Sequence, residues 1–454
     1  MKYIIIISLF LISCSKSELI LKPANRTADS LAVEPSVSLP SYTLKVDTFK
    51  ISISGYGEPY KLYGEMEESI SNRLVYYAGG KEHMIVLPSN KDTAFPAIHF
   101  IKTNNKWSFE GSYPEGKMTG ARNYEVVDNN GTIVYCDFGT ETVQPWPGGH
   151  LYMVKTVGDK LVWKQVSPKK SFYHSVTAAD VNNDGLVDVI GSHMGSYNDW
   201  KGFAGGIHIY TQRPDGNFDE NRSLMNVNEQ NIWPGDHGTG AVYATNLFGD
   251  NRPEIIRATY FATNKYAIAV YKYSDSSHKY ELYNVPNKLG VFEGNAGATS
   301  IRSIDYDNDG DNDLAIAYEG YINGVQIWIN NNNQMSPNQH IALTDQELNI
   351  REFEVADVDG NGYKDIILHT FHHGNLFRIN PVPGNYRGDG IKLNNLIWKN
   401  NNGVFSFSTK EINVLNIKPC NIKGFYTNGK LKFNGFEMIG VKDDQGIKLY
   451  EIIL

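Results

Sequence analysis

A short strand-like segment with one large aromatic residue recurs along the chain, and it limits the folds that the chain can adopt. Its seven copies carry their aromatic residues at Phe100, Tyr152, Tyr210, Tyr271, Trp328, Trp398 and Tyr450. Successive aromatic residues lie 52, 58, 61, 57, 70 and 52 positions apart. This length is typical of a four-stranded sheet that repeats around an axis. The spacing therefore predicts seven similar sheets.

The sequence between these copies is also strand-like. From Tyr42 onward, Val, Ile, Tyr and Phe alternate with polar residues over short runs that Gly, Asn and Asp interrupt, and no long segment has a helical period. With 41% hydrophobic residues the chain can bury a large core. We therefore predict an all-β fold, a seven-bladed β-propeller over residues 42–454. The strand at 44–54 is expected to complete the blade at the C-terminus.

Three loops of nine residues combine acidic residues with glycine. They read DVNNDGLVD from Asp180, DYDNDGDND from Asp305 and DVDGNGYKD from Asp357. Side-chain oxygens stand at positions one, three, five and nine, and hard cations prefer several such ligands in a tight loop. The predicted structural Ca²⁺ ligands are Asp180, Asn182, Asp184, Asp188, Asp305, Asp307, Asp309, Asp313, Asp357, Asp359, Asn361 and Asp365. A fourth copy, NLFGDNRPE from Asn246, has lost acids and is interpreted as a turn without metal.

The N-terminus predicts export. Met1 and Lys2 precede an apolar run that is too short to span a bilayer, which is typical of a signal peptide over residues 1–13. The run ends in Leu-Ile-Ser-Cys, which resembles the lipobox of bacterial lipoproteins and implies lipidation of Cys14. Residues 14–41 are rich in Ser, Pro and Ala and are expected to be a flexible linker. We expect a lipid-anchored protein of the cell envelope, surface-exposed or periplasmic.

Charge and cysteine content limit the partners. The net charge of -8 disfavours binding to nucleic acid through overall charge. We expect a monomer that touches the membrane only through its lipid. Cys136 and Cys420 could form a disulfide, could join histidines in a Zn²⁺ site, or could each be buried. The sequence favours simple burial.

The acidic loops and the aromatic segments together resemble FG-GAP or VCBS repeats of integrin-like propellers, best over residues 171–407. The resemblance implies that each loop joins the first and second strands of a blade on one face. Residues about five or six positions before and five after a loop then lie at the opposite face. The residues expected there are His174, His193, His237, Tyr243, Arg257, Tyr260, Arg302, Tyr318, Arg351, His369, His372 and His373.

A face rich in His, Arg and Tyr suits an anionic carbohydrate. Elimination across a uronic acid needs a cation for the carboxylate, a base for the neighbouring proton and an acid for the leaving oxygen. The segments YHSVTAADVNNDGLVDVIGSHMG and AVYATNLFGDNRPEIIRATY are similar to those of seven-bladed polysaccharide lyases that degrade ulvan, a sulfated uronate polymer. This resemblance implies an ulvan lyase acting by β-elimination.

The lyase resemblance also implies roles for individual residues. His174 and Tyr243 become the acid and base, in an order that the pattern leaves open, and Arg257 neutralises the carboxylate. His193 positions substrate, and Tyr260 is the substitute for Tyr243. The predicted substrate-binding residues are His193, His237, Tyr260 and Arg302.

A non-catalytic function remains the alternative. A calcium-stiffened propeller can serve glycan capture or adhesion, and Trp146, Trp200 and Trp233 could stack on sugars in either case. No serine-hydrolase elbow, zinc-protease motif or phosphate loop occurs in the sequence. Glycoside hydrolysis by two carboxylates stays open, although most Asp clusters are already assigned to calcium.

Overall fold

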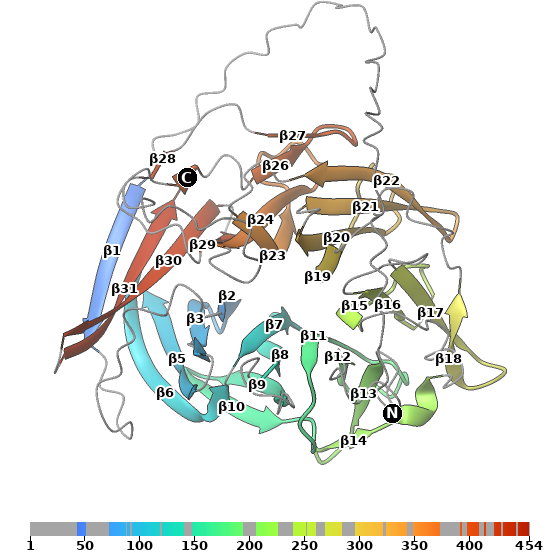
Figure 1. Cartoon of the computed structure of the whole chain (residues 1–454), viewed down its shortest axis with the longest axis horizontal. Coiled ribbons are helices and arrows are strands. Elements are labelled where there is room, and N and C mark those ends of the chain that lie inside the picture. The colour runs from blue at the N-terminus through green and yellow to red at the C-terminus, as the bar shows by residue number, and fades with distance from the viewer. Residues whose placement is uncertain are drawn as a thin grey trace, which may run out of the picture. The chain divides into compact units, whose positions relative to one another are not determined.

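Antiparallel strands form six large sheets that surround a common axis (Figure 1). A computed structural model describes residues 43–50, 72–87, 89–90, 93–118, 120–139, 148–193, 206–225, 239–250, 252–259, 268–283, 296–320, 324–342, 348–372, 391–392, 397–407, 413–414, 422–427, 430–441 and 444–453. These residues belong to one compact unit, Ser41–Leu454. In this part of the chain, no helix has the length and apolarity needed to cross a bilayer. Residues 1–41, with the expected signal peptide, lipidation site and linker, lie outside the described residues.

The first three sheets follow one another along the chain. The first contains β2 Asn72–Ala78, β3 Lys81–Leu87, β4 Ser89–Asn90, β5 Thr93–Thr103 and β6 Lys106–Met118. The second contains β7 Ala121–Val126, β8 Thr132–Asp137, β9 Leu151–Val157 and β10 Lys160–Gln165. The third contains β11 Tyr173–Ala179, β12 Asp188–His193, β13 Ile207–Gln212 and β14 Phe218–Glu220, followed by the short helix η1 Arg222–Leu224.

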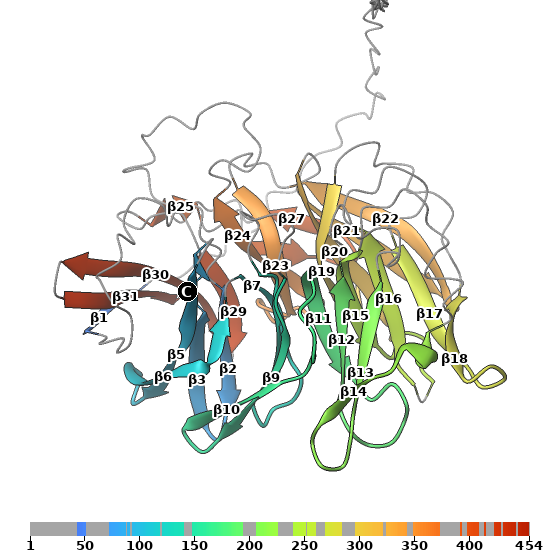
Figure 2. The same ribbon diagram turned by 60° about the horizontal axis from the view of Figure 1, so that its bottom comes forward.

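The next two sheets repeat the same antiparallel order. The fourth contains β15 Thr239–Thr245, β16 Glu254–Thr259, β17 Ile268–Ser274 and β18 Lys279–Tyr283. The fifth contains β19 Ala296–Ile304, β20 Asp313–Gly320, β21 Gly324–Asn331 and β22 Gln334–Ala342. Figure 2 shows the inner strands β11, β15 and β19 of the third, fourth and fifth sheets next to one another, and these neighbours are in contact.

The sixth sheet has eight strands. It contains β23 Leu348–Ala356, β24 Asp365–His372, β26 Ile397–Asn400, β27 Phe405–Phe407, β29 Ile422–Thr427, β30 Lys430–Val441, β31 Asp444–Ile453 and β1 Thr43–Lys50. The short strands β25 Ile391–Lys392 and β28 Asn413–Val414 form a separate pair. The N-terminal strand β1 pairs along its whole length with the C-terminal strand β31. The expected completion of the last blade is thus confirmed for residues 43–50.

The prediction of seven separate blades is wrong for the described residues. The strands β29, β30, β31 and β1 follow one another like a seventh blade, but β29 also pairs with β24 through His369 and Thr370. Because this pairing joins two sets of four strands edge to edge, the structure has six large sheets. The inner strands contact one another in the closed order β2, β7, β11, β15, β19, β23 and β29.

The recurring aromatic residues all lie on the third strand of a four-stranded set, on β5, β9, β13, β17, β21, β26 and β31. The six whose side chains are described are buried. Core clusters form between neighbouring sheets, so that one cluster joins the third sheet to the fourth and another joins the fourth to the fifth. Burial of these large side chains between sheets explains why the aromatic position repeats once per sheet.

Candidate functional site

Five inner strands share a β-bulge at the same position. The register shifts by one residue early in β7, β11, β15, β19 and β23. The inserted residues, named here the bulge layer, are Arg122, His174, Gly240, Thr299 and Arg351. Each stands six positions before the first residue of the turn that follows its strand, at the opposite end from the acidic loops. Bulges redirect side chains and occur often beside active sites.

His174 connects the third sheet to the fourth in this layer. Its Nδ1 lies 2.6 Å from the carbonyl oxygen of Gly240, and the imidazole is buried. A carbonyl can only accept a hydrogen bond, so Nδ1 of the neutral ring must carry the proton. The ring of Phe138 contacts His174 edge-on at 5.7 Å between centroids. This tautomer leaves the lone pair on Nε2, as a general base requires.

Arg122 is a member of the bulge layer that the sequence analysis missed. Its guanidinium lies 4.6 Å from the centre of the Phe138 ring, and Nη2 lies 3.5 Å from Oε1 of Glu319 on β20. Arg122 precedes Asp128 by six positions, which is the spacing of His174 before Asp180. That spacing could have revealed Arg122. The turn at Asp128 was not recognised, because it lacks the other acids of the repeated loops.

His193 does not share the described surroundings of His174. It pairs across the strands with Tyr173, whose side chain belongs to the core between the second and third sheets. Its Nδ1 lies 2.5 Å from the hydroxyl oxygen of Ser171, and its ring contacts His208 edge-on. His174 instead faces Gly240 of the fourth sheet. The two histidines are neighbours in the hairpin but have different described partners.

Tyr243 and Arg257 lie on opposite faces of the fourth sheet. Val242 pairs with Arg257 across the strands, so these two side chains share a face, and Tyr243 follows Val242 and points the other way. Val242 packs in the core toward the third sheet. Tyr243 packs in the core toward the fifth sheet, where its hydroxyl lies 3.4 Å from that of Ser303. The structure thus assigns His174 and Arg257 to the same sheet interface but does not bring Tyr243 there.

Tyr243 and Arg302 are both nearer the acidic loops than expected. Each stands three positions before its loop, as Glu125 does before Asp128. Arg302 interacts electrostatically with Glu125, a partly buried carboxyl that also bonds to Thr177 and accepts from the backbone of Ala178. Burial raises the pKa of Glu125 to about 7 against these favourable contacts. The placement of Arg302 with His174 at the opposite end is therefore wrong, because three strand residues separate the two levels by about 10 Å.

Several expected residues lie elsewhere or outside the described part. His369 is buried on β24, with Nδ1 3.7 Å from Glu352 and Nε2 4.0 Å from Glu354. Tyr318 is a fully buried core residue, and burial raises its pKa. Of the other predicted residues, the structure does not describe His237, Tyr260, His373, Trp146, Trp200 and Trp233.

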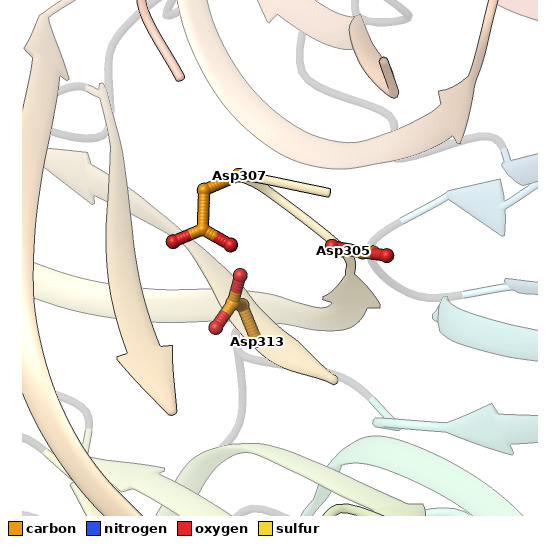
Figure 3. A group of neighbouring side chains, drawn as sticks. All are labelled: Asp305, Asp307 and Asp313. Carbon is orange, nitrogen blue, oxygen red and sulfur yellow. The ribbon is translucent and has the colours of Figure 1, made fainter. Parts of the chain in front are cut away.

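The loop at 305–313 gathers carboxylates. Single oxygens of Asp305, Asp307 and Asp313 all lie within 4.8 Å of one another, and Figure 3 shows the carboxylates of Asp307 and Asp313 facing each other. Oδ1 of Asp305 is buried and accepts no hydrogen bond from the described residues. Burial, reinforced by Asp307 and Asp311, raises the pKa of Asp313 to about 7. An all-oxygen set with a buried acceptor fits a hard cation such as Ca²⁺.

The ninth residue of each full loop has a structural contact that the sequence did not predict. Asp188, Asp313 and Asp365 are 0% exposed. In Asp313, one oxygen accepts the N–H of Tyr306 in the loop at 2.9 Å, and the other accepts the N–H of Asn330 on β21 at 2.7 Å. Asp188 and Asp365 make the same two kinds of bond. The acid therefore ties the loop to the third strand of its own sheet.

The three full loops share one backbone conformation. Positions four and six have positive φ in all three, at Asn183 and Gly185, Asn308 and Gly310, and Gly360 and Gly362. Glycine adopts this conformation without steric cost, and asparagine tolerates it. The loops join the first and second strands of their sheets, as the repeat resemblance implied.

The other loops differ in their positive neighbours. In the loop at 357–365, oxygens of Asp357, Asp359 and Asp365 also lie within 4.8 Å of one another, but Nζ of Lys399 is 3.0 Å from Asp359. In the loop at 180–188, Asp180 accepts the backbone N–H groups of Asp184 and Gly185. In these two loops the protein thus supplies Lys399 beside Asp359 and backbone donors to Asp180, whereas Oδ1 of Asp305 accepts no hydrogen bond from the described residues.

The eroded loop at 246–254 has an internal cation. Nζ of Lys272 lies 2.7 Å from Oδ2 of Asp250 and near the rings of Phe248 and Tyr283. Glu254, its ninth residue, is buried and accepts the N–H groups of Leu247 and Phe248. A lysine thus supplies the positive charge beside an acid of this loop.

Cys136 is a free thiol in the core between the second and third sheets. Burial raises its pKa above the ordinary value of a thiol. Its partner in the predicted alternatives, Cys420, lies outside the described residues. Burial of Cys136 is confirmed, and a zinc site stays a prediction.

Comparison with known protein families supports the repeat. The model of the FG-GAP-like repeat matches residues 260–368, which include the fifth sheet and its acidic loop. No curated protein sequence matches the chain. Among solved structures, AofleA from Arthrobotrys oligospora is 13% identical with a TM-score of 0.42, and the match covers 82% of this chain and 92% of that one.

Two further structures are similar at the same low level. A protein from Lactobacillus plantarum is 12% identical with a TM-score of 0.37, covering 76% of this chain and 97% of that one. The periplasmic gluconolactonase of Pseudomonas aeruginosa is 10% identical with a TM-score of 0.33, covering 66% of this chain and 92% of that one. These similarities are too low to carry a functional argument, and the lyase resemblance stays a prediction. The chain is a β-propeller that contains an FG-GAP-like repeat.

Proposed function

We propose that this propeller is a polysaccharide lyase that cleaves a sulfated, uronate-containing polymer of the ulvan type by β-elimination. The observation that carries the proposal is the bond between Nδ1 of His174 and the carbonyl of Gly240 at 2.6 Å. It fixes the tautomer whose Nε2 can take a proton. The β-bulge in β11 is what aims this imidazole at the fourth sheet.

Arginines near His174 supply the second requirement. A carboxylate must be neutralised before the proton beside it becomes acidic enough to remove. Arg257 belongs to the same sheet interface as His174, and Arg122 shares Phe138 with it. In the elimination, His174 takes the proton alpha to the carboxylate, a carbon–carbon double bond forms, and the bond to the beta oxygen breaks. The same imidazolium can return its proton to that oxygen, so the proposal does not need Tyr243.

The acidic loops have a structural role in this proposal. Ca²⁺ held by Asp305, Asp307 and Asp313 would neutralise the acids that close the first hairpin of the fifth sheet. The loops lie at the other end of the inner strands from the bulge layer, so the ion would hold the hairpin and take no part in the elimination. A lipid anchor at Cys14 would keep the enzyme at the cell envelope.

The ultraviolet absorbance of the unsaturated uronate product tests the proposal. Purified protein with calcium should raise the absorbance on ulvan, and the variant His174→Ala should lose activity by roughly 100-fold or more, as expected for a general base. The exposed Arg213, which pairs with Asp215 at the surface, provides the control Arg213→Gln with unchanged activity. A folded wild-type protein that gives no absorbance on any uronate polymer would refute the lyase.

Burial favours a second candidate function. Arg122, His174 and Arg257 are only 4%, 1% and 2% exposed. Two buried arginines beside a buried imidazole suit the binding of a fixed anionic group better than the turnover of a polymer, so a glycan-binding protein without catalysis is the alternative. Retention of the protein on immobilised ulvan, with no unsaturated product released, would select this candidate.

A further inference from the structure

An ion pair joins two sheets that are not neighbours. Arg122 lies on β7 of the second sheet and Glu319 lies on β20 of the fifth. The inner strands of the third and fourth sheets lie between them in the ring of contacts. Arg122 and Glu319 are 4% and 7% exposed. The pair therefore spans the interior of the propeller at the end where the bulge layer lies.

The geometry of this pair is loose. Nη2 and Oε1 are 3.5 Å apart, which is longer than the short bonds of about 2.8 Å that guanidinium and carboxylate groups form when they fit well. The guanidinium also lies over the Phe138 ring, 4.6 Å from its centre. The same ring contacts His174. Phe138 thus contacts both Arg122 and His174, the proposed base. The carboxylate of Glu319 lies beside Arg122, where a substrate carboxylate would bind.

We propose that Glu319 is a resident counter-ion, and that a uronate carboxylate replaces it beside Arg122 when the polysaccharide binds. Arg122 then contributes, together with Arg257, to specificity for uronate over neutral sugars. This inference rests on the proposed function, because the exchange would bring the carboxylate to the ring that also holds His174. A substrate carboxylate that is free to move can form two short parallel bonds to the guanidinium in place of the 3.5 Å contact that Glu319 makes.

Binding of oligosaccharides tests the exchange. We would measure the Kd of a uronate oligosaccharide and of a neutral oligosaccharide of equal length by calorimetry, in a His174→Ala background that prevents cleavage. Glu319→Gln should tighten uronate binding about tenfold, because the competitor loses its charge, and Arg122→Gln should weaken it about tenfold, both within the range for charge-assisted hydrogen bonds. Binding of the neutral sugar should not change. The surface variant Arg213→Gln should leave both Kd values unchanged.

Removal of Glu319 could unfold the protein, because it leaves a buried arginine without that carboxylate. The double variant Arg122→Gln/Glu319→Gln removes both charges and should bind the uronate sugar as weakly as Arg122→Gln does, because Arg257 is unchanged in both. Equal or weaker uronate binding by a folded Glu319→Gln variant would overturn the exchange. A double variant that binds uronate as tightly as the His174→Ala parent would also overturn it.

The result is separable from the lyase proposal. Tighter uronate binding by Glu319→Gln, with no product from the wild type, supports the exchange and refutes the lyase. Full lyase activity in Arg122→Gln refutes the exchange and leaves the lyase standing.

Discussion

The loops at 246–254 and 305–313 occupy the same place in neighbouring sheets but balance their charges differently. The first keeps Asp250 and Glu254, and Lys272 lies beside Asp250. The second has five aspartates, and no described lysine or arginine forms an ion pair with them. Both loops nevertheless join the first and second strands of their sheets. Hairpin geometry is thus compatible with either an internal cation or, as we propose, a bound one.

This comparison teaches that the ninth residue and the other acids have separate roles. Glu254 and Asp313 are both buried and both accept backbone N–H groups. The bond to the ninth residue therefore persists where the cation ligands have been lost. The side chains at positions one, three and five can differ between loops, because a lysine on the third strand, such as Lys272, can neutralise an acid of the loop in place of a bound cation.

The largest expected effect is the loss of the ninth residue. Asp313→Ala leaves the buried N–H groups of Tyr306 and Asn330 without an acceptor, at a cost of about 2 kcal/mol each, or about 4 kcal/mol in total. Glu254→Ala should cost less, because its described bonds stay within its own loop. Urea unfolding would measure both. Equal losses would show that the tie to β21 adds no stability.

Removal of calcium should affect the loop at 305–313 and leave the loop at 246–254 unchanged. At a calcium concentration about 100 times the Kd, chelation should lower the free energy of unfolding by about 3 kcal/mol. Hydrogen exchange should rise in the loop at 305–313 and stay constant in the loop at 246–254, where Lys272 is part of the protein. If chelation leaves hydrogen exchange unchanged in both loops, the proposed calcium ion in the loop at 305–313 is contradicted.

Low pH should destabilise the first sheet, which contains neither of these two loops. In the first sheet, His83 donates from Nε2 to the carbonyl of Ala78, and its Nδ1 lies 3.0 Å from Nε2 of His99. Burial and the neighbouring His83 lower the pKa of His99 to about 3. Below pH 6.5, His99 binds a proton in the unfolded chain but not in the folded protein. The free energy of unfolding therefore falls as the pH is lowered, by about 2 kcal/mol at pH 5.

The acid effect has a matched control. Tyr76, Tyr113, Lys81 and Asp159 are the other titratable groups near this pair, and the last two form an exposed ion pair. His99→Asn should flatten the dependence of unfolding on pH between 6.5 and 5, whereas His278→Asn at an exposed turn should not. A slope that survives His99→Asn would assign the acid sensitivity to other groups.

The smallest expected effect is the loss of the internal cation. Lys272→Met should cost about 1 kcal/mol, because its ion pair with Asp250 is partly exposed. Lys272→Arg should retain most of the stability. Lys399→Met should act in the opposite direction on calcium, since it removes a positive charge 3.0 Å from Asp359. Titration with calcium would detect tighter binding in that variant, and weaker binding would contradict the comparison.

Local sequence patterns predicted much of the fold. The aromatic positions mark the third strand of each four-stranded set, because only a large buried side chain fills the space between sheets. The acidic loops were placed between the correct strands, because their positive-φ positions need glycine or asparagine. His174 was placed at the end opposite the loops. Each of these features depends on residues close together in the chain.

The errors share a different origin. Seven blades became six sheets, because β29 pairs with β24 over two residues that no local pattern marks. Tyr243 was assigned to the site of His174, because its spacing from Arg257 matched that of the lyase family. Strand alternation, however, puts Tyr243 and Arg257 on opposite faces of the fourth sheet. Arg122 was missed because its turn lacks the repeated acids. Register and long-range pairing decide these outcomes.

The sequence by itself therefore determined the repeat length, the third-strand aromatic residues, the acidic loops and their hairpins. These follow from backbone preferences and burial that act over a few residues. Only the tertiary structure decided the number of sheets, the bulge layer and the pairing of Arg122 with Glu319. A one-residue register shift reverses which face a side chain occupies, and contacts across the ring join residues far apart in the chain.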